Sequence, residues 1–391
     1  MRIILVLTDP PLPFGNAASR WFYVLVRELV RRGFDLTVLA AAANADAIEA
    51  SRTLFPESQY DVRYFLPDQR RFVDRWHSVS QPFGYVYSKA MRCELQQQIR
   101  RGFDVLHLEH LWSGWLGWDV PERSVVNVHY LFDLDLRQAA TRSTVENARR
   151  RSWLRAERKL LSRFPHISAL TDTLSQRIRQ IAPAANVMTT PLGFDVRNYR
   201  FAALARNQPP RIGLIGSFDW TPSWLAGKRL LDRLWPQIQQ SVPGVQLQIV
   251  GRNAATAFAK YARLPSVQIV ENVPDIVPYF HNLDVMLYAP EFGSGMKVKV
   301  LEAMALGTAV VTNTNGVEGL PADNGVHVAL GEADEALIEQ TVALLQDNQR
   351  RRNQINAARQ LVQRHCNPLV TVDAMQRCYL KLERNACRQI A

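Results

Sequence analysis

Residues 284–320 read DVMLYAPEFGSGMKVKVLEAMALGTAVVTNTNGVEGL, and this stretch decides the fold. Its first aliphatic run predicts a buried strand, and the spacing of Val298, Leu301 and Ala305 predicts one face of a helix. Gly307 predicts the end of that helix, and TAVVTN then predicts a second strand. A strand, a helix and a strand in this order are typical of a parallel sheet covered by helices.

The same rhythm occurs in both halves of the chain. RIILVL (2–7) predicts a strand and residues 18–32, closed by Gly33, predict a helix. RIGLIGS (211–217) predicts another strand, followed by a helix near 224–240. The further predicted strands are DLTVLAA, DVLHLEH, SVVNVHY and HISALT in the first half, and VQLQIVG and VQIVE in the second.

Two successive layers of this kind predict an α/β protein of two Rossmann-like domains facing each other across a cleft. A length of 391 residues also favours two cores over one. The segment before Arg211, rich in proline and polar residues, predicts a linker. We expect an N-terminal domain over 1–195, a linker over 196–210, a C-terminal domain over 211–372, and a last helix over 373–391 that crosses back to the N-terminal domain.

Composition indicates an ordinary soluble globular protein, with 47% hydrophobic and 21% charged residues. The apolar run after Arg2 is too short for a signal peptide, and no stretch approaches the ~20 apolar residues of a membrane span. The four cysteines lack metal-site spacing, which favours a reducing cytoplasm. We therefore expect a cytoplasmic protein whose contact with a membrane, if it has one, is peripheral.

The formal net charge of +11 is concentrated in the predicted helix at residues 149–163. Its basic residues favour contact with polyanions, and its apolar residues allow two interpretations. The first is a basic amphipathic helix at the inner membrane surface. The second is a solvated helix face above an ordinary core stripe, because the apolar positions have normal helix periodicity. A basic-aromatic nucleic-acid motif is lacking, so nucleic acid is not an expected partner.

The turn before the helix at 298 suits a phosphate group. Gly293 and Gly295 let the backbone approach a ligand closely, and the free N–H groups at a helix start favour an anion. Lys297 and Lys299 place positive charge at the positive end of the helix dipole, which is unfavourable for the helix itself. Their presence indicates that an anion binds there. The Glu302 carboxylate suits the vicinal hydroxyls of a ribose, whereas its alternative is an exposed helix residue.

The stretch GSGMKVKVLEAMALGTAVVTNTNGVEGL closely resembles the donor-binding region of retaining GT-B glycosyltransferases of family 4, and the resemblance extends over nearly the whole chain. It implies a sugar transferase that uses a nucleotide-diphosphate sugar without a metal or other cofactor. It also implies that Glu302 is the second of two donor-site glutamates. The first falls at Ser294, so its role is either lost or taken by a neighbour such as Glu291. A subgroup of the family carries a Gly-rich turn and two basic residues in place of that glutamate, and this sequence resembles that subgroup.

The resemblance implies donor contacts in several loops. Lys297 is the favoured diphosphate contact because it lies nearer the turn than Lys299. Gly216 follows the strand at 211, where Ser217 stands at the family's arginine position and Lys228 is the nearest basic residue in the helix. Arg252 and the turn at Val273 are placed to line the base. The full set of donor-binding predictions is Gly216, Ser217, Lys228, Arg252, Val273, Gly293, Ser294, Gly295, Met296, Lys297, Val298 and Glu302.

On the acceptor side, Gly15, Asn16 and Arg20 lie between the first strand and the first helix. His129 resembles the histidine that contacts the transferred sugar, and Asp133 follows it. We expect His129, Lys297 and Glu302 to be the catalytic residues. His107 and Glu109 share one face of a predicted strand, yet they show no metal-site pattern.

The resulting hypothesis is a retaining glycosyltransferase that passes a sugar to a hydroxyl acceptor in glycan, polysaccharide or glycoconjugate biosynthesis. One version of this hypothesis has a lipid-linked acceptor. The alternatives are a nucleotide-sugar epimerase or a phosphorylase of the same fold, and a non-catalytic polyanion-binding relative. A nicotinamide dehydrogenase is disfavoured because GxGxxG opens neither half.

Overall fold

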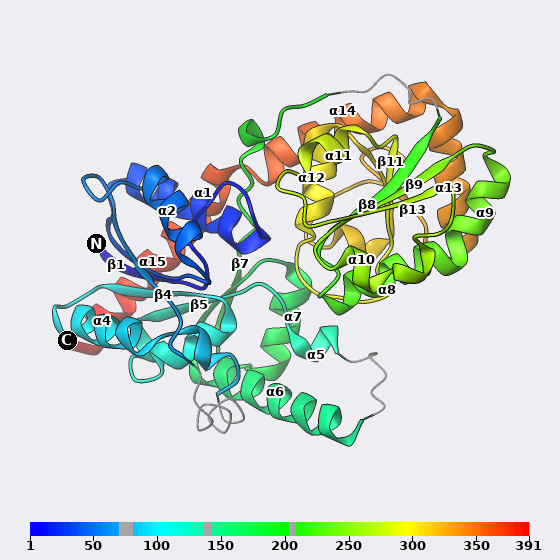
Figure 1. Ribbon diagram of the computed structural model, residues 1–391. Coiled ribbons are helices and arrows are strands. Elements are labelled where there is room, and N and C mark those ends of the chain that lie inside the picture. The colour runs from blue at the N-terminus through cyan, green and yellow to red at the C-terminus, as the bar shows by residue number, and fades with distance from the viewer. Residues whose placement is uncertain (70–80, 137–142, 203–208, 391) are drawn as a thin grey trace. The chain divides into compact units, whose positions relative to one another are not determined.

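The computed structural model describes residues 1–69, 81–136, 143–202 and 209–390. The chain divides into two compact units (Figure 1). The N-terminal unit comprises Met1–Phe194 and Pro368–Ala391, and the C-terminal unit comprises Asp195–Asn367. Each unit is a parallel sheet with helices around it, so the α/β architecture of two Rossmann-like domains is confirmed.

The N-terminal unit is built on a seven-stranded sheet of order β3-β2-β1-β4-β5-β6-β7. All of its neighbouring strands run parallel. Residues 3–7 of the central strand are completely buried, which explains its unbroken aliphatic sequence. The strands are β1 (Arg2–Leu7), β2 (Asp35–Ala41), β3 (Asp61–Phe65), β4 (Val105–Glu109), β5 (Ser124–Val128), β6 (His166–Ala169) and β7 (Asn186–Thr189).

The helices of this unit alternate with its strands. The predicted first helix is confirmed as α1 (Ala17–Arg31), which Gly33 follows with a left-handed backbone at φ 76°. The others are α2 (Ala45–Leu54), α4 (Lys89–Arg100), α5 (Phe132–Asp135), α6 (Thr144–Arg163), α7 (Asp172–Ile181) and α15 (Pro368–Ile390).

The C-terminal unit repeats the plan with a six-stranded sheet of order β10-β9-β8-β11-β12-β13. Its strands are β8 (Arg211–Ile215), β9 (Gln246–Gly251), β10 (Val267–Glu271), β11 (Val285–Tyr288), β12 (Ala309–Thr312) and β13 (Ala329–Leu330). Its helices are α8 (Thr221–Arg229), α9 (Trp235–Ser241), α10 (Ala254–Ala257), α11 (Val277–His281), α12 (Val298–Leu306), α13 (Asp334–Gln346) and α14 (Asn348–His365). The predicted helix near 224–240 corresponds to α8 and α9, which a π-helical segment, Leu230–Leu234, joins.

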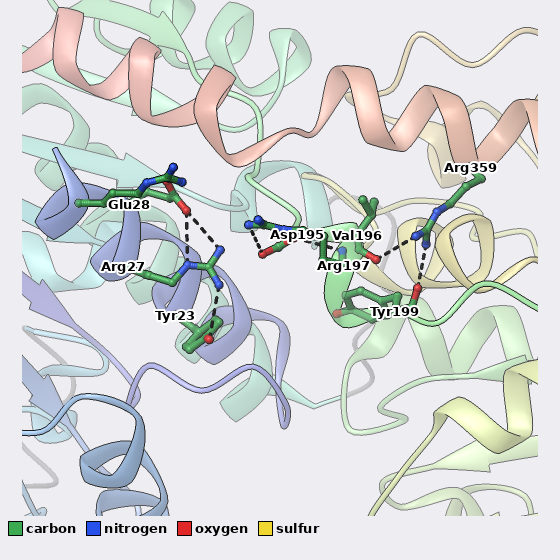
Figure 2. Close-up of polar contacts among 9 residues, drawn as sticks. Tyr23, Arg27, Glu28, Asp195, Val196, Arg197, Tyr199 and Arg359 are labelled. Carbon is green, nitrogen blue, oxygen red and sulfur yellow. Dashed lines mark hydrogen bonds and ion pairs between the residues drawn. The ribbon is translucent and has the colours of Figure 1, made fainter.

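The segment predicted as a linker begins inside the C-terminal unit. The guanidinium of Arg359 in α14 donates to the carbonyls of Val196 and Tyr199, each at 3.0 Å (Figure 2). The amide of Ala202 donates to the carbonyl of Leu306 at 3.0 Å. Backbone groups that are bound in this way hold residues 195–202 on the C-terminal unit, and the remainder of the segment, residues 203–208, lies outside the described residues.

The last helix, α15, belongs to the N-terminal unit from Pro368 onward, five residues earlier than the predicted start of the returning helix. Arg32 at the end of α1 pairs with Asp373 at 2.7 Å and donates to Gln376 at 2.8 Å. The hydroxyl of Thr371 donates to the carbonyl of Pro191 at 2.8 Å. Proline at 368 is the first helical residue, where a missing N–H costs nothing.

The apolar side of α6 is part of the core. Leu160 and Leu161 are completely buried and Phe164 is 2% exposed, so these side chains pack inside the N-terminal unit. Arg149, Arg151, Arg155, Arg158 and Lys159 are exposed. The C-terminal part of this helix thus carries a core stripe as the second interpretation describes, while its basic residues and Val145 meet the solvent.

Within the described residues, none of the helices combines the length and the apolar character that crossing a membrane requires. Cys93, Cys366 and Cys378 are free thiols. Burial raises the pKa of the Cys366 and Cys378 thiols to about 12, so both stay protonated.

Candidate active site

The strand order of the C-terminal sheet reverses between β8 and β11. Strand β8 lies between β9 and β11, so the loops after β8 and β11 leave the sheet in opposite directions. Parallel α/β sheets bind ligands at such a point, outside the carboxyl ends of the strands. Gly216 follows β8, and the glycine turn at 293–295 follows β11, so the two predicted phosphate loops meet at this position.

Gly216 lies in a crowded place. Its amide donates to the carbonyl of Val250 at 2.9 Å. A Cβ atom on the neighbouring Gly251 would come within 1.7 Å of the Gly216 carbonyl oxygen, and φ of Gly251 is 142°. Glycine at 251 is therefore required for the two loops to approach each other. The loop after β8 is held close to β9, and Lys299 of α12 packs against it.

The turn before α12 is built on glycines and is held by Lys297. Gly293 and Gly295 have φ values of 129° and 80°, which L-residues with side chains rarely adopt. The Lys297 ammonium donates to the carbonyl of Gly295 at 2.5 Å and of Gly293 at 3.3 Å. It also pairs with Glu318 at 3.3 Å. Lys297 thus stabilises the turn through the turn's own carbonyl groups. In this structure its ammonium contacts protein groups, whereas the sequence predicts a diphosphate contact for it.

Lys299 is the lysine that lies at the switch point. A Cβ on Gly216 would be 3.0 Å from Lys299 Cε and 3.1 Å from Nζ, so the ammonium packs against the loop after β8. Nζ donates to the Ser223 hydroxyl at 2.5 Å and lies 4.3 Å from the Tyr288 ring centroid. Burial, and then the charge of Lys297, lowers the pKa of Lys299 to about 7. An approaching anion would favour the charged form of this side chain.

Glu302 is buried in α12 with 4% of its surface exposed, so the interpretation as an exposed helix residue is wrong. Helix α12 begins at Val298 after Lys297 and ends at Gly307, whose φ is 91°. Residues 300–306 are all buried. A carboxylate in such a helix is expensive to desolvate, which indicates a specific requirement for its charge or hydrogen-bonding capacity.

Lys228, one of the predicted donor residues, lies away from the switch point and has another partner. Lys228 occupies the last turn of α8 and pairs with Asp232, one turn further on. The start of α8 is the end near the β8 loop, and seven residues of helix separate Lys228 from it by about 10 Å. Ser217, by contrast, directly follows Gly216 and is partly exposed. Lys299, which was not among the predicted donor residues, is a basic group that packs against this loop.

The other predicted donor residues follow the strand ends as expected. Arg252 is exposed after β9 and its carbonyl accepts from the Phe218 amide at 3.0 Å. Val273 is partly exposed after β10. Ser294, Met296 and Val298 surround the turn and are also partly exposed.

Glu291, the suggested substitute for the first glutamate, is engaged elsewhere. Its carboxylate pairs with Arg233 at 3.2 Å. The carboxylate that is bonded to the lysine of the turn is that of Glu318, whose side chain is 10% exposed. Glu318 lies 21 positions after Lys297, so no local pattern joins the two residues.

In the N-terminal sheet the order reverses between β1 and β4, so the loops after these strands form the corresponding edge. Gly15 is exposed with φ 88°. The Asn16 side chain caps α1 by accepting from the Ser19 amide at 2.8 Å, and it donates to Asp9 at 2.9 Å. Arg20 lies one turn into α1 and is partly exposed. Asn16 therefore has a structural role that its sequence position did not reveal.

His129 directly follows β5 and is paired with a buried carboxylate. Its Nε2 atom lies 2.7 Å from Glu109 Oε2 at the end of β4. The Asn127 amide donates to both oxygens of Glu109, at 3.2 and 3.1 Å. Glu109 is completely buried, whereas the His129 side chain is 10% exposed. A histidine held by a carboxylate in this way presents its other nitrogen to a ligand.

His107 and Glu109 share one face of β4, as predicted, and their Nε2 and Oε1 atoms lie 3.0 Å apart. Burial by itself would raise the pKa of Glu109, but His107 and His129 outweigh it and hold that pKa well below the usual value. Glu109 is thus an anion at neutral pH. The link of this pair to His129 has no local pattern in the sequence, because β4 and β5 are neighbours only in the folded sheet.

His110 stacks on His129, with ring centroids 4.4 Å apart and planes inclined by 25°. Its backbone has φ 73°, an uncommon value for a residue with a side chain. Burial, and then His129, lowers the pKa of His110 to about 3, so its ring is neutral at physiological pH. A strained residue at a strand end that packs on His129 is typical of a functional site.

Asp133 contacts two charged residues of neighbouring helices. Its carboxylate accepts from Arg177 at 2.5 Å, and its amide donates to Glu157 at 2.9 Å. Burial raises the pKa of Glu157 to about 7. Asp133 therefore belongs to the contacts between α5, α6 and α7. Among the residues that the structure describes, no group of three or more His, Cys, Asp or Glu side chains is arranged to hold a metal ion.

Family models match both halves of the chain. Residues 18–198 match the model described as Glycosyltransferase Family 4, and residues 209–347 match Glycosyl transferases group 1. No curated protein sequence matches the chain.

Solved structures of similar fold cover nearly the whole chain. The sucrose-phosphate synthase of Thermosynechococcus elongatus superimposes with a TM-score of 0.71 at 18% identity, over 97% of this chain and 98% of that one. Anabaena HepE in complex with UDP and glucose gives 0.67 at 15% identity, over 96% and 99%. Staphylococcus aureus TarM, in a complex that contains UDP, gives 0.68 at 9% identity, over 97% and 100%. These likenesses establish the GT-B fold.

Proposed function

From a chain that carries a glycosyltransferase domain in each half, we propose an enzyme that transfers a sugar from a nucleoside-diphosphate donor to a hydroxyl acceptor with retention of configuration. The observation that carries this proposal is the position of Lys299 against Gly216 at the switch point of the C-terminal sheet. A partly buried cation beside a glycine loop and a helix start is suited to a diphosphate. The UDP complexes of HepE and TarM support the choice of donor.

In this proposal the donor lies along the strand ends of the C-terminal unit. The base lies by Arg252 and Val273, the ribose hydroxyls donate to Glu302, and the diphosphate lies between Gly216 and the turn at 293–295. Lys299 neutralises the diphosphate, while Lys297 and Glu318 keep the turn in shape. Charge that develops on the leaving diphosphate is then stabilised by groups that are already in place.

The transfer step breaks the bond between the anomeric carbon and the diphosphate oxygen as the acceptor oxygen bonds to the same face of that carbon. The acceptor proton passes to the departing phosphate oxygen, so atoms and charge balance. His129 contacts the transferred sugar in this proposal, with Gly15 and Arg20 on the acceptor side. We propose that the reaction needs no metal, because the helix start and Lys299 supply the positive charge.

Acceptor-dependent release of the nucleoside diphosphate tests this function. The purified enzyme is supplied with nucleoside-diphosphate sugars, with and without acceptors that bear hydroxyl groups. A transferase releases the diphosphate in proportion to glycosylated product. An epimerase changes the donor without releasing it, and a phosphorylase requires inorganic phosphate. A non-catalytic relative would bind polyanions in a salt-sensitive manner without turnover.

Replacement of Glu302 by glutamine is expected to raise the donor KM about 10- to 100-fold with a smaller change in kcat. The substitution keeps the volume of the side chain and removes the charge that ribose hydroxyls bind, and hydrogen bonds to charged groups contribute about 1.5–3 kcal/mol. Steady-state kinetics at varied donor concentration measure the effect. Glu339→Gln on the more distant α13 is a matched control. An unchanged donor KM in Glu302→Gln would remove Glu302 from the donor site.

We further propose that the protein acts in the cytoplasm in the synthesis of a glycan, polysaccharide or glycoconjugate, and that the exposed basic face of α6 contacts an anionic membrane. Because Leu160 and Leu161 of α6 lie in the core, the contact in this proposal is mainly electrostatic. Each lysine or arginine near an anionic surface contributes about 1 kcal/mol. This proposal favours a lipid-linked acceptor.

Vesicle sedimentation is expected to show binding to anionic vesicles that is lost in about 0.5 M salt, because screening shortens the reach of exposed charges. The variant with glutamine at Arg149, Arg151, Arg155 and Arg158 should lose most of this binding. Vesicles of zwitterionic lipid alone provide the control. Equal binding of the variant and the native protein would exclude α6 as the contact surface.

A further inference from the structure

A continuous chain of polar contacts joins the C-terminal helix to His129. The Tyr379 hydroxyl of α15 lies 2.6 Å from His107 Nδ1, 272 positions away in the sequence. His107 Nε2 lies 3.0 Å from Glu109 Oε1, and Glu109 Oε2 lies 2.7 Å from His129 Nε2. Tyr379, His107 and Glu109 are completely buried, and His129 is the member that reaches the surface.

The environment of each group indicates which atom is the donor in each contact between Tyr379 and His129. Burial raises the pKa of Tyr379 well above its usual value, so the hydroxyl keeps its proton, and in our assignment it is the donor in the bond to His107 Nδ1. His107 then carries its own proton on Nε2, facing the Glu109 carboxylate. Glu109 is an anion, with one carboxylate oxygen 3.0 Å from His107 Nε2 and the other bonded to His129 at 2.7 Å. His129 consequently holds its proton on Nε2 and leaves Nδ1 as an acceptor.

The tautomer of His129 depends on Glu109, and the orientation of Glu109 depends on its neighbours. The Asn127 amide reaches both carboxylate oxygens from β5. His107 Nε2, also on β4, lies 3.0 Å from Glu109 Oε1. If Nδ1 had no partner, the His107 proton would be able to move from Nε2 to Nδ1. Reversal would place a lone pair opposite the Glu109 carboxylate, which is repulsive in a buried site. The Tyr379 hydroxyl, 2.6 Å from Nδ1, holds the His107 ring so that its Nε2 atom stays toward Glu109.

We infer that Tyr379 is a positioning residue that fixes the tautomer and orientation of His129 through His107 and Glu109. The inference rests on the proposed role of His129 in sugar transfer, and it extends the functional site to the last helix of the chain. It also gives α15 a role beyond packing on α1 and β4, because the end of the chain completes the polar chain behind the candidate acceptor side.

Kinetics of Tyr379→Phe in the full-length protein test the inference. The substitution removes one oxygen atom and keeps the ring. We expect kcat to fall about tenfold and the donor KM to stay within about twofold, since one buried hydrogen bond is lost away from the donor. Thr371→Val is the matched control, because it removes another buried hydroxyl bond from the same helix. It should leave kcat within about twofold even if both variants unfold at similarly lowered temperatures.

A second comparison separates positioning from general loosening of the fold. In a His129→Ala background, Tyr379→Phe should change kcat by less than about twofold, because the residue it positions is gone. If Tyr379→Phe lowers kcat equally with and without His129, or no more than Thr371→Val does, the inference is overturned.

Nuclear magnetic resonance of ¹⁵N-labelled histidine rings provides a readout that needs no turnover. The His129 signals, assigned by their loss in His129→Ala, should indicate a proton on Nε2 at neutral pH and a mixture of tautomers in Tyr379→Phe. An unchanged tautomer in Tyr379→Phe would contradict the inference. If the native protein turns over no donor with any acceptor, the proposed function fails, and these spectra alone decide whether Tyr379 positions His129.

Discussion

Replacement of Lys299 by methionine is expected to lower kcat/KM for sugar transfer about 100- to 1,000-fold, which is the usual cost of removing one preorganised donor from a developing anion. Methionine fills a similar volume, so the packing against Gly216 and Tyr288 is largely kept. The loss then reports the charge of the ammonium. Steady-state kinetics with saturating acceptor and varied donor measure it.

Two further lysine variants show whether position or charge alone matters. Lys260 is exposed on the same unit and pairs with Asp232, so Lys260→Met should stay within about twofold of the native enzyme. Lys297→Met should lower activity less than Lys299→Met, because Lys297 binds the carbonyls of the turn and Glu318. A greater loss in Lys297→Met than in Lys299→Met would return the diphosphate contact to Lys297, where the sequence had placed it.

Replacement of His129 by alanine is expected to lower kcat about 100-fold with little change in donor binding, within the range measured for side chains that assist at the reacting centre. Glu109→Gln should reproduce much of this loss, because an amide in place of the carboxylate offers His129 a donor where it needs an acceptor. Single-turnover rates with saturating donor measure both. His327→Ala, in the other unit, is the control.

Unfolding must be followed in the Glu109 variant. The Glu109 carboxylate is completely buried with two histidines and Asn127 around it, so its replacement affects stability as well as chemistry. His129→Ala, at the partly exposed end, avoids that difficulty. Full transfer activity in a folded His129→Ala protein would exclude this residue from catalysis.

Strands that are buried on both faces could be predicted from the sequence. Strand β1 and strand β11 are unbroken aliphatic runs, and both were predicted. Strands β3 and β7 were missed because they are edge strands whose residues are only partly buried, so polar side chains interrupt their pattern. Strand β13, of two residues, is too short to show any pattern.

The donor element was predicted as a region, but its lysines were ranked by sequence distance. Lys297 lies nearer the turn along the chain, yet its ammonium folds back onto the carbonyls of Gly293 and Gly295. Lys299 reaches the β8 loop because strands β8 and β11 are neighbours in the sheet. Val285 of β11 pairs with Ile212 of β8, 73 positions earlier, and such pairing is a property of the fold that spacing within one motif does not contain.

The same reason explains what was missed around His129. Glu109 and His107 come from one strand and Tyr379 from the last helix, and the sequence contains no local pattern that joins them. Their contacts depend on the β4–β5 register and on the return of α15 to the N-terminal unit. Individual residues of this set were recognisable, whereas their connection was not.

The measurement that tests the donor site most directly is calorimetric binding of nucleoside-diphosphate sugars at pH 6, 7 and 8 to the native protein and to Lys299→Met. A sugar-linked diphosphate avoids the ionisation of a terminal phosphate near pH 6. Because the pKa of Lys299 is lowered to about 7, the ammonium is charged at pH 6 and loses its proton as the pH rises. We expect one donor to bind the native protein most tightly at pH 6 and up to about tenfold more weakly per pH unit above 7, and Lys299→Met to bind weakly without this dependence. Equal affinity and equal pH dependence in the two proteins would contradict the proposed site.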